Sequence, residues 1–133
     1  MRLLVLDESQ LLAWMVERLA PPGTLVTGLT SFDEARRVVQ EDPPDAAVVS
    51  LTSAHLPWRE FARLCAAARP RVPILWESCI FGSAEEAGLD PAEGDARFLR
   101  TPASRTILKE AVERLLDDAR EARTNLVFQA ANP

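Results

Sequence analysis

Short apolar runs separated by amphipathic segments make up most of the chain. Residues 3–6, 46–49 and 72–76 are almost wholly apolar and are each followed by polar residues, which is typical of strands buried on both faces of a sheet. Residues 24–27 and 97–100 predict two further short strands. The pattern therefore predicts five strands along the chain.

Apolar residues at helical spacing predict a helix after each of the first three strands and a longer helix at the end of the chain. Ser9 is expected to cap the first helix, and Ser31 with Glu34 forms a capping box for the second. The last helix is expected to begin at Ser104. The apolar positions of the first three helices are Leu11, Leu12, Met15, Val16 and Leu19, then Phe32, Ala35, Val38 and Val39, then Trp58, Phe61, Leu64, Cys65 and Ala68.

The segment before the last strand breaks this regularity. Gly82, Gly88, Pro91 and Gly94 interrupt it, and only residues 83–87 have a helical pattern, so the helix expected here is short or remodelled. Alternation of strands and helices implies right-handed crossovers between parallel strands. The sequence thus predicts an α/β fold: a single doubly wound, five-stranded parallel sheet with helices on both faces and a long C-terminal helix.

The composition indicates one acidic domain with an unusual choice of basic residues. The chain has 133 residues and a net charge of −5, from 15 basic and 20 acidic residues. This length suits one domain, and the acidic balance argues against nucleic acid as a partner, because phosphates need a basic face. Only one of the basic residues is lysine, at Lys109.

No segment predicts a membrane span or a secretion signal. The first apolar run stops at Asp7, and no run approaches the ~18 apolar residues that a spanning helix needs. A cytoplasmic protein without membrane contacts is therefore expected. Cys65 and Cys79 lack the spacing of a metal site or of a disulfide framework, so two reduced, partly buried thiols are expected.

Polar residues gather at the predicted carboxyl ends of the strands, where parallel α/β sheets place their ligand sites. The residues at these ends are Asp7, Glu8, Ser50, Ser78 and Thr101. Their spacing is 42 residues from Glu8 to Ser50, 28 from Ser50 to Ser78 and 23 from Ser78 to Thr101. The carboxyl edge of the sheet is thus the candidate functional site.

In order and spacing these strand ends resemble the receiver domain of two-component response regulators. The resemblance covers residues 1–122 and implies a flavodoxin-like (βα)5 fold, with residues 123–133 as a C-terminal tail. It also implies that Asp7 and Glu8 match the acidic pair that helps to hold magnesium in the family, and that Ser78 matches the hydroxyl residue that senses the phosphoryl group.

The resemblance extends to the last strand. Phe98 matches an aromatic residue of the family's switch, and Pro102 matches a proline that follows a cis peptide bond. Ser78 and Phe98 are therefore the switch-like positions of this sequence.

Two parts of the phosphoryl-transfer chemistry are missing. An acyl phosphate needs a carboxylate nucleophile and a cation on the phosphoryl group, but Ser50 stands at the acceptor position and Thr101 replaces the lysine. Residues 46–89 contain no aspartate that could substitute. Lys109 lies two turns into the last helix, and strand alternation is expected to point Arg100 to the opposite face. The sequence predicts a degenerate phosphorylation site.

We therefore expect a phosphorylation-independent pseudo-receiver that is not an enzyme and that binds protein partners in a bacterial signalling pathway. Two alternatives stay open. One is an active receiver with a displaced phosphoryl acceptor. The other is a nucleotide-binding or enzymatic domain that uses the crevice at the strand ends, although no glycine-rich loop follows a strand.

No cofactor or metal is expected. Asp7 and Glu8 are the candidate metal ligands, but two carboxylates alone make a poor magnesium site, and both also favour the start of the first helix through its dipole. His55 is the one histidine that could activate Ser50 as a nucleophile, and we interpret it instead as a loop residue without that role.

The last helix carries the clue to a partner. Its apolar stripe continues through Leu115, Ala119 and Ala122 to Leu126, beyond the length needed to cover a domain of this size. These positions are expected to contact a protein partner, with a two-stranded helical homodimer as one form of that contact.

The three tryptophans are expected to differ in exposure. Trp76 lies within a strand and is predicted to belong to the core. Trp14 lies off the apolar face of its helix and Trp58 opens the third helix, so both are candidates for partly exposed contact positions.

Overall fold

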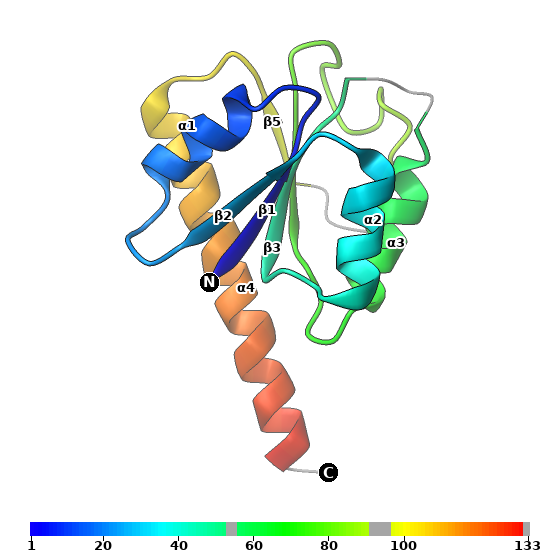
Figure 1. Ribbon diagram of the computed structural model, residues 1–133, viewed down its shortest axis with the longest axis vertical. Coiled ribbons are helices and arrows are strands. Elements are labelled where there is room, and N and C mark those ends of the chain that lie inside the picture. Colours follow the sequence, from blue (N-terminus) through cyan, green and yellow to red (C-terminus); the bar gives the residue numbers. More distant parts are fainter. Residues whose placement is uncertain (53–55, 91–96, 132–133) are drawn as a thin grey trace.

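The computed structural model describes residues 1–52, 56–90 and 97–131, and its centre is one parallel sheet of five strands in the order β2-β1-β3-β4-β5 (Figure 1). Each neighbouring pair in this order is parallel, which confirms the predicted sheet. The strands are β1 (Arg2–Leu6), β2 (Leu25–Leu29), β3 (Ala46–Ser50), β4 (Ile74–Ser78) and β5 (Phe98–Arg100).

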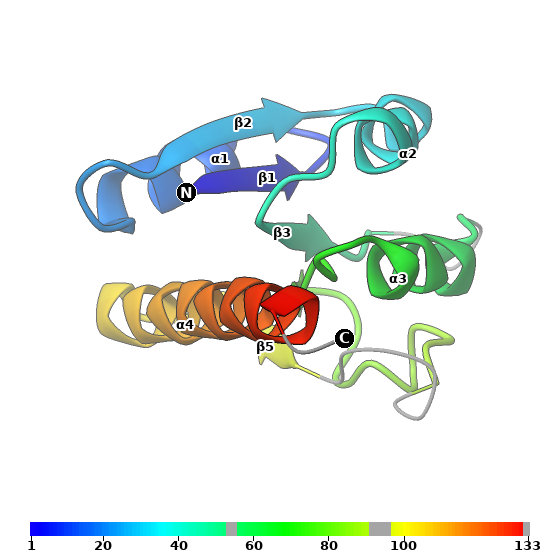
Figure 2. The same ribbon diagram turned by 90° about the horizontal axis from the view of Figure 1, so that it is seen from below.

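Helices cover both faces of this sheet. Figure 2 shows α1 and α4 on one side of the strands and α2 and α3 on the other. The doubly wound α/β fold predicted from the sequence is therefore confirmed. Within the described residues the helices are α1 (Leu11–Leu19), α2 (Phe32–Glu41), α3 (Trp58–Ala67) and α4 (Arg105–Ala131).

The α1/α4 core fills the space between one face of the sheet and these two helices. Alternate residues of the strands point into it, as the period of two requires. In α1, Leu12 and Val16 are buried, whereas Leu11 is 62% exposed and Met15 is only partly buried. The apolar face predicted for α1 is therefore wrong at Leu11. The buried face of this helix includes Ala13, which the prediction left out.

The α2/α3 core on the opposite face is rich in aromatic rings. Trp76 of β4 is fully buried, with its ring centroid 6.2 Å from that of Trp58 and 6.4 Å from that of Phe61. The core position of Trp76 is confirmed. Trp58 is only 4% exposed, so it is not a surface contact residue, whereas Trp14 is 53% exposed.

A free thiol lies in the same core. Cys65 is buried, and burial raises the pKa of its thiol to about 12, so the neutral thiol persists well above neutral pH. Cys79 is also free but exposed, which corrects the expectation of two partly buried thiols.

The predicted helix caps have different outcomes. The backbone N–H of Glu34 donates to Ser31 Oγ over 3.2 Å, so the N-cap of α2 is confirmed. Ser9 does not cap α1, whose N-cap position is Gln10. Instead its hydroxyl donates to Asp7 Oδ2 and accepts from the N–H of Leu11, which holds the turn between β1 and α1.

Three strands begin later than predicted, namely β2 at Leu25, β4 at Ile74 and β5 at Phe98. β4 starts at Ile74 because Pro73 has no N–H to donate to a neighbouring strand. β2 runs to Leu29 and includes Gly28, where a Cβ atom would lie 2.6 Å from that of Ala13. A glycine is therefore needed where α1 crosses closest to β2.

The described residues between β4 and β5 form turns rather than a helix. The Ser83 hydroxyl accepts from the N–H of Glu86 over 3.2 Å, and the carboxylate of Glu86 accepts in turn from the N–H of Gly82. Ala84 and Leu89 are buried against the α2/α3 core. The helical pattern of residues 83–87 is not realised as a helix, so of the two alternatives predicted for this segment, a short or a remodelled helix, the described residues show the remodelled one. Pro91 and Gly94 lie outside the described residues.

The long C-terminal helix α4 covers the sheet with its first half and then extends away from the domain (Figure 1). Leu115 and Ala119 are 0% and 1% exposed within the α1/α4 core. The expectation that these two residues contact a partner is wrong, because the domain itself covers them. Ala122 and Leu126 are only partly buried.

The helix continues to Ala131, through most of the segment expected to be a tail. Arg123 pairs with Asp45 over 3.5 Å, which ties the start of this segment to the domain. No helix in the described part of the chain has the length and apolar character needed to cross a membrane.

Candidate functional site

The carboxyl ends of the strands bring polar residues from opposite ends of the chain together. Ser50 and Glu77 are paired Cα positions of β3 and β4, and neighbours in a parallel sheet point to the same face. Leu99 pairs with Glu77 in β5, so Thr101, two residues later, follows on that face too. This face is the one that α1 and α4 cover.

A cavity of about 340 Å³ lies at this edge, between the strand ends, α1 and α4. Three of the five predicted site residues line it, namely Asp7, Ser50 and Thr101. Apolar side chains of the two helices form the other wall. The complete lining is Asp7, Leu11, Leu12, Met15, Ser50, Thr52, Glu77, Cys79, Thr101, Pro102, Ala103 and Leu108.

Glu77 is the central carboxylate of this cavity, and sequence reasoning left it out of the site. Its side chain is 6% exposed, and its Oε2 accepts a hydrogen bond from Thr101 Oγ1 over 2.7 Å. The signal that would have found it is strand alternation, because Glu77 must face opposite to Ser78 and therefore toward the same side as Ser50.

Ser78 is not among the residues that line the cavity. Its hydroxyl is fully buried on the α2/α3 side, where it donates to the carbonyl of Leu51 over 2.7 Å. It also accepts from the N–H groups of Ile80 and Phe81, each over 3.0 Å. The structure thus gives Ser78 the contacts of a residue that fixes the turn after β4.

The predicted acidic pair is divided between two environments. Asp7 lines the cavity and accepts from Ser9 Oγ over 3.3 Å. Glu8 is exposed and does not line the cavity, although its Oε1 accepts over 3.0 Å from Oγ1 of Thr52, which does.

Of the predicted magnesium ligands only Asp7 lines the cavity, where Ser50 supplies a hydroxyl in place of a carboxylate and Glu77 is the second carboxylate. Within the described residues no group of three or more histidine, cysteine or acidic side chains could hold a metal. His55, the candidate base for Ser50, lies outside those residues.

The basic side chains near the site point elsewhere. Arg100 directs its guanidinium toward the loop at Gly82, where a Cβ atom would lie 3.1 Å from Nη1, as the predicted opposite orientation requires. Lys109 lies on the outer surface of α4, with its Nζ 3.9 Å from Glu113 Oε1. Among the residues that the structure describes, no arginine or lysine lines the cavity, so its two carboxylates disfavour a bound anion.

The fold matches many solved structures, although no family model matches the sequence and a search of curated proteins finds no match. A response regulator from Thermotoga maritima superposes with a TM-score of 0.72 at 16% identity, over 87% of this chain and 97% of the other. The chemotaxis response regulator CheY4 of Vibrio cholerae gives a TM-score of 0.69 at 21% identity, over 86% of this chain and 98% of that chain.

The fold is that of a response-regulator receiver. NtrX from Brucella abortus, solved in complex with ADP, matches 92% of this chain with a TM-score of 0.71 at 17% identity. This chain spans only 28% of NtrX, so the same receiver fold also occurs as one part of a longer protein.

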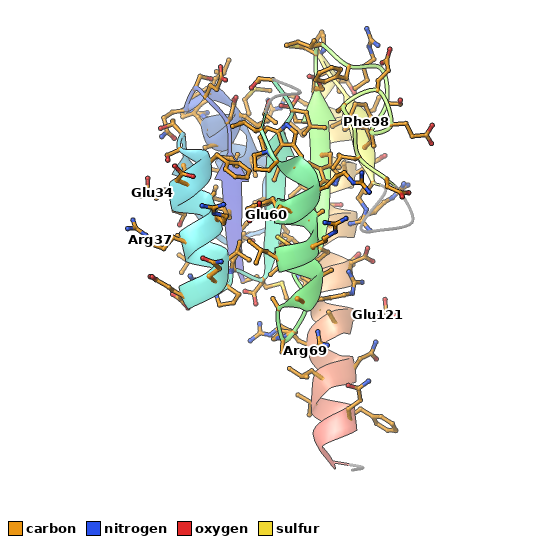
Figure 3. The ribbon with its side chains drawn as sticks, turned by 90° about the vertical axis from the view of Figure 1, so that its right-hand side faces the viewer. Glu34, Arg37, Glu60, Arg69, Phe98 and Glu121 are labelled. Carbon is orange, nitrogen blue, oxygen red and sulfur yellow. The ribbon has the colours of Figure 1, made fainter. Side chains whose placement is uncertain are left out.

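Two features of the last strand agree with the receiver resemblance. The Thr101–Pro102 peptide bond is cis, as the resemblance implied. Phe98, labelled in Figure 3, is partly buried and packs against the α2/α3 core. Ser50 and Thr101, which the resemblance places at the acceptor and lysine positions, both line the cavity.

Proposed function

We propose that this chain is a pseudo-receiver: a receiver fold that serves a signalling pathway through protein contacts without being phosphorylated. One observation carries the proposal. The cavity at the strand ends contains a serine at the acceptor position and a Thr101–Glu77 hydrogen bond in place of a lysine. Such a site lacks the cation that would offset the charge of a phosphoryl group.

Incubation with acetyl phosphate and magnesium is expected to leave the intact mass of the protein unchanged. The Ser50 hydroxyl makes no hydrogen bond to a base in the described part of the chain, and no basic side chain lines the cavity, so neither the nucleophile nor the transferred group is activated. Intact-mass spectrometry checks this result, with an active receiver treated in parallel as the positive control.

The competing function is an active receiver with a displaced phosphoryl acceptor, and Glu77 is the candidate for that acceptor. Its carboxylate lies in the same cavity as Asp7, so it is the acceptor that such a protein would use. A phosphoryl adduct on the natural protein that disappears in Glu77→Gln would establish this alternative and refute the pseudo-receiver proposal.

The part of α4 that extends from the domain is the surface we propose for a protein partner. Val127 and Phe128 are 69% and 67% exposed, and partly buried Leu126 lies beside them. Figure 3 shows the helix continuing past Glu121 and beyond the level of Arg69, which follows α3. With a net charge of −5, we expect the contact to be with protein in a bacterial cytoplasm rather than with nucleic acid or membrane.

A second copy of the chain is the partner proposed for this surface, through a two-stranded contact between C-terminal helices. Light scattering is expected to give the full chain about twice its monomer mass of 14.7 kDa, and to give a chain ending at Ala119 the monomer mass. The truncated chain keeps the buried positions of α4, so circular dichroism should show a folded control. A monomeric full chain at high concentration would remove the homodimer.

A further inference from the structure

The cavity at the strand ends has the dimensions of a small-molecule site. Its volume of about 340 Å³ lies at the lower end of the range of roughly 300–1,000 Å³ for ligand pockets. Apolar side chains from two helices, Leu12 and Met15 of α1 and Leu108 of α4, form one wall. A ligand in this cavity would place an apolar body against α1 and α4.

The opposite wall carries uncompensated negative charge. Glu77 is more than nine-tenths buried, and its one hydrogen bond in the described structure comes from the neutral hydroxyl of Thr101. Glu77 lines the cavity, and its Oε1 receives no hydrogen bond from any described residue. Asp7 adds a second carboxylate. Burial of a carboxylate is costly unless a positive charge or several donors offset it.

The protein supplies no such positive charge from the described residues around the cavity. Arg100 lies on the other side of the sheet and Lys109 is on the outer face of α4 near Glu113. Arg105, at the start of α4, belongs to a separate surface hollow beside Pro21 and Pro22. A cationic ligand would supply the positive charge that the described residues around the cavity lack.

We propose that this cavity binds a small organic cation, with a protonated amine that donates to the carboxylate of Glu77 and an apolar body that packs against α1 and α4. Hydrogen bonds from a cation to a carboxylate are about twice as strong as those between neutral groups, so the amine selects the ligand class. This binding site goes beyond the proposed pseudo-receiver function, since it depends neither on the absence of phosphorylation nor on a protein partner at the C-terminal end of α4.

Titration with three aromatic ligands of similar size and different charge tests the charge selection. Benzylammonium, benzyl alcohol and benzoate are added to the full-length protein, and binding is followed by the shifts of backbone amide resonances. Benzylammonium is expected to bind at least about tenfold more tightly than benzyl alcohol, with benzoate weakest. The largest shifts are expected at Thr52, Cys79 and Thr101, which line the cavity.

Two variants and one control assign the selectivity to Glu77. Glu77→Gln keeps an oxygen that can accept from Thr101 but removes the charge, so it should lose most of the preference for the cation. Glu110→Gln makes the same change at an exposed position of α4 and should bind as the natural protein does. Ala103→Leu fills part of the cavity and should weaken benzylammonium and benzyl alcohol together.

Several results would overturn the proposal. One is that benzylammonium does not bind, and another is that benzoate binds as tightly as benzylammonium or more tightly. The others are amide shifts confined to a surface away from the cavity, and an unchanged preference for benzylammonium in a folded Glu77→Gln. If Glu77→Gln does not fold, the order of the three ligands on the natural protein and the effect of Ala103→Leu still decide the outcome. Phosphorylation with acetyl phosphate is measured separately, so failure of the pseudo-receiver function is recognised independently.

Discussion

Replacing Trp76 with alanine is expected to lower the free energy of unfolding by about 3–5 kcal/mol, the range observed when large buried aromatic side chains are truncated. Trp76 is the largest fully buried side chain, and its ring makes edge contacts with Trp58 and Phe61. Its removal leaves a cavity between β4 and α3. Because domains of this kind have total stabilities of about 5–15 kcal/mol, the variant should lie near the limit of folding.

Urea unfolding followed by circular dichroism measures this loss, and Trp14→Ala is the matched control. Trp14 is half-exposed, and its ring stacks on the guanidinium of Arg18 at 4.1 Å. An exposed cation–π contact contributes at most about 1 kcal/mol, so the control should lose no more than that. Equal losses in the two variants would contradict the assignment of Trp76 to the main packing cluster. Trp76→Phe provides a milder substitution if the alanine variant does not fold.

Ser78→Ala is expected to destabilise the domain by about 2 kcal/mol, because it leaves buried backbone groups without partners. The hydroxyl of Ser78 donates to the Leu51 carbonyl and accepts from the N–H groups of Ile80 and Phe81. It thereby connects the end of β3 to the turn that follows β4. A residue whose only role was to sense a phosphoryl group would show no such loss of stability.

Ser50→Ala is the control for this experiment, since it removes a hydroxyl from β3, the strand that pairs with β4, at the same edge of the sheet. Ser50 is 8% exposed, and its hydroxyl makes no hydrogen bond with the described residues. Its loss should change the free energy of unfolding by less than about 0.5 kcal/mol. A larger loss for Ser50→Ala than for Ser78→Ala would contradict the structural role given to Ser78.

The central strands were predictable because their burial is nearly complete. Residues 46–49 form an unbroken apolar run, and the structure places β3 there with every residue buried. β2 was less accurate because it is an edge strand, with Leu25 68% exposed, so its pattern is weak. Apolar periodicity indicates which residues are buried. It predicts the bounds of an element poorly where one side of that element is open to solvent.

The site was predicted in part because a sheet's edge follows from its strand order, whereas the orientation of each side chain depends on register. Asp7, Ser50 and Thr101 share the cavity, as their positions at the strand ends implied. Ser78 and Glu77 are adjacent in sequence but face opposite sides of the sheet. The end of β4 therefore contributes one polar residue to each face of the sheet. The prediction included only Ser78 and left out the carboxylate of Glu77.

The boundary of the buried part of α4 could not be read from its apolar stripe. Leu115 and Ala119 lie on the same stripe as Ala122 and Leu126, but the first two are covered by β strands and α1, whereas the last two are not. Only the position of the sheet beneath the helix determines where intramolecular packing ends. A periodic sequence contains no marker for that position.

The last three turns of α4 also give the domain a segment whose helicity depends on its surroundings. At 1.5 Å per residue the 27 residues of this helix span about 40 Å, longer than the sheet that its first half covers. Short helices without tertiary contacts are marginal in water, so these turns gain most of their stability from whatever touches them. Slowed hydrogen exchange at the amides after Arg123 would then mark the moment at which a partner covers them.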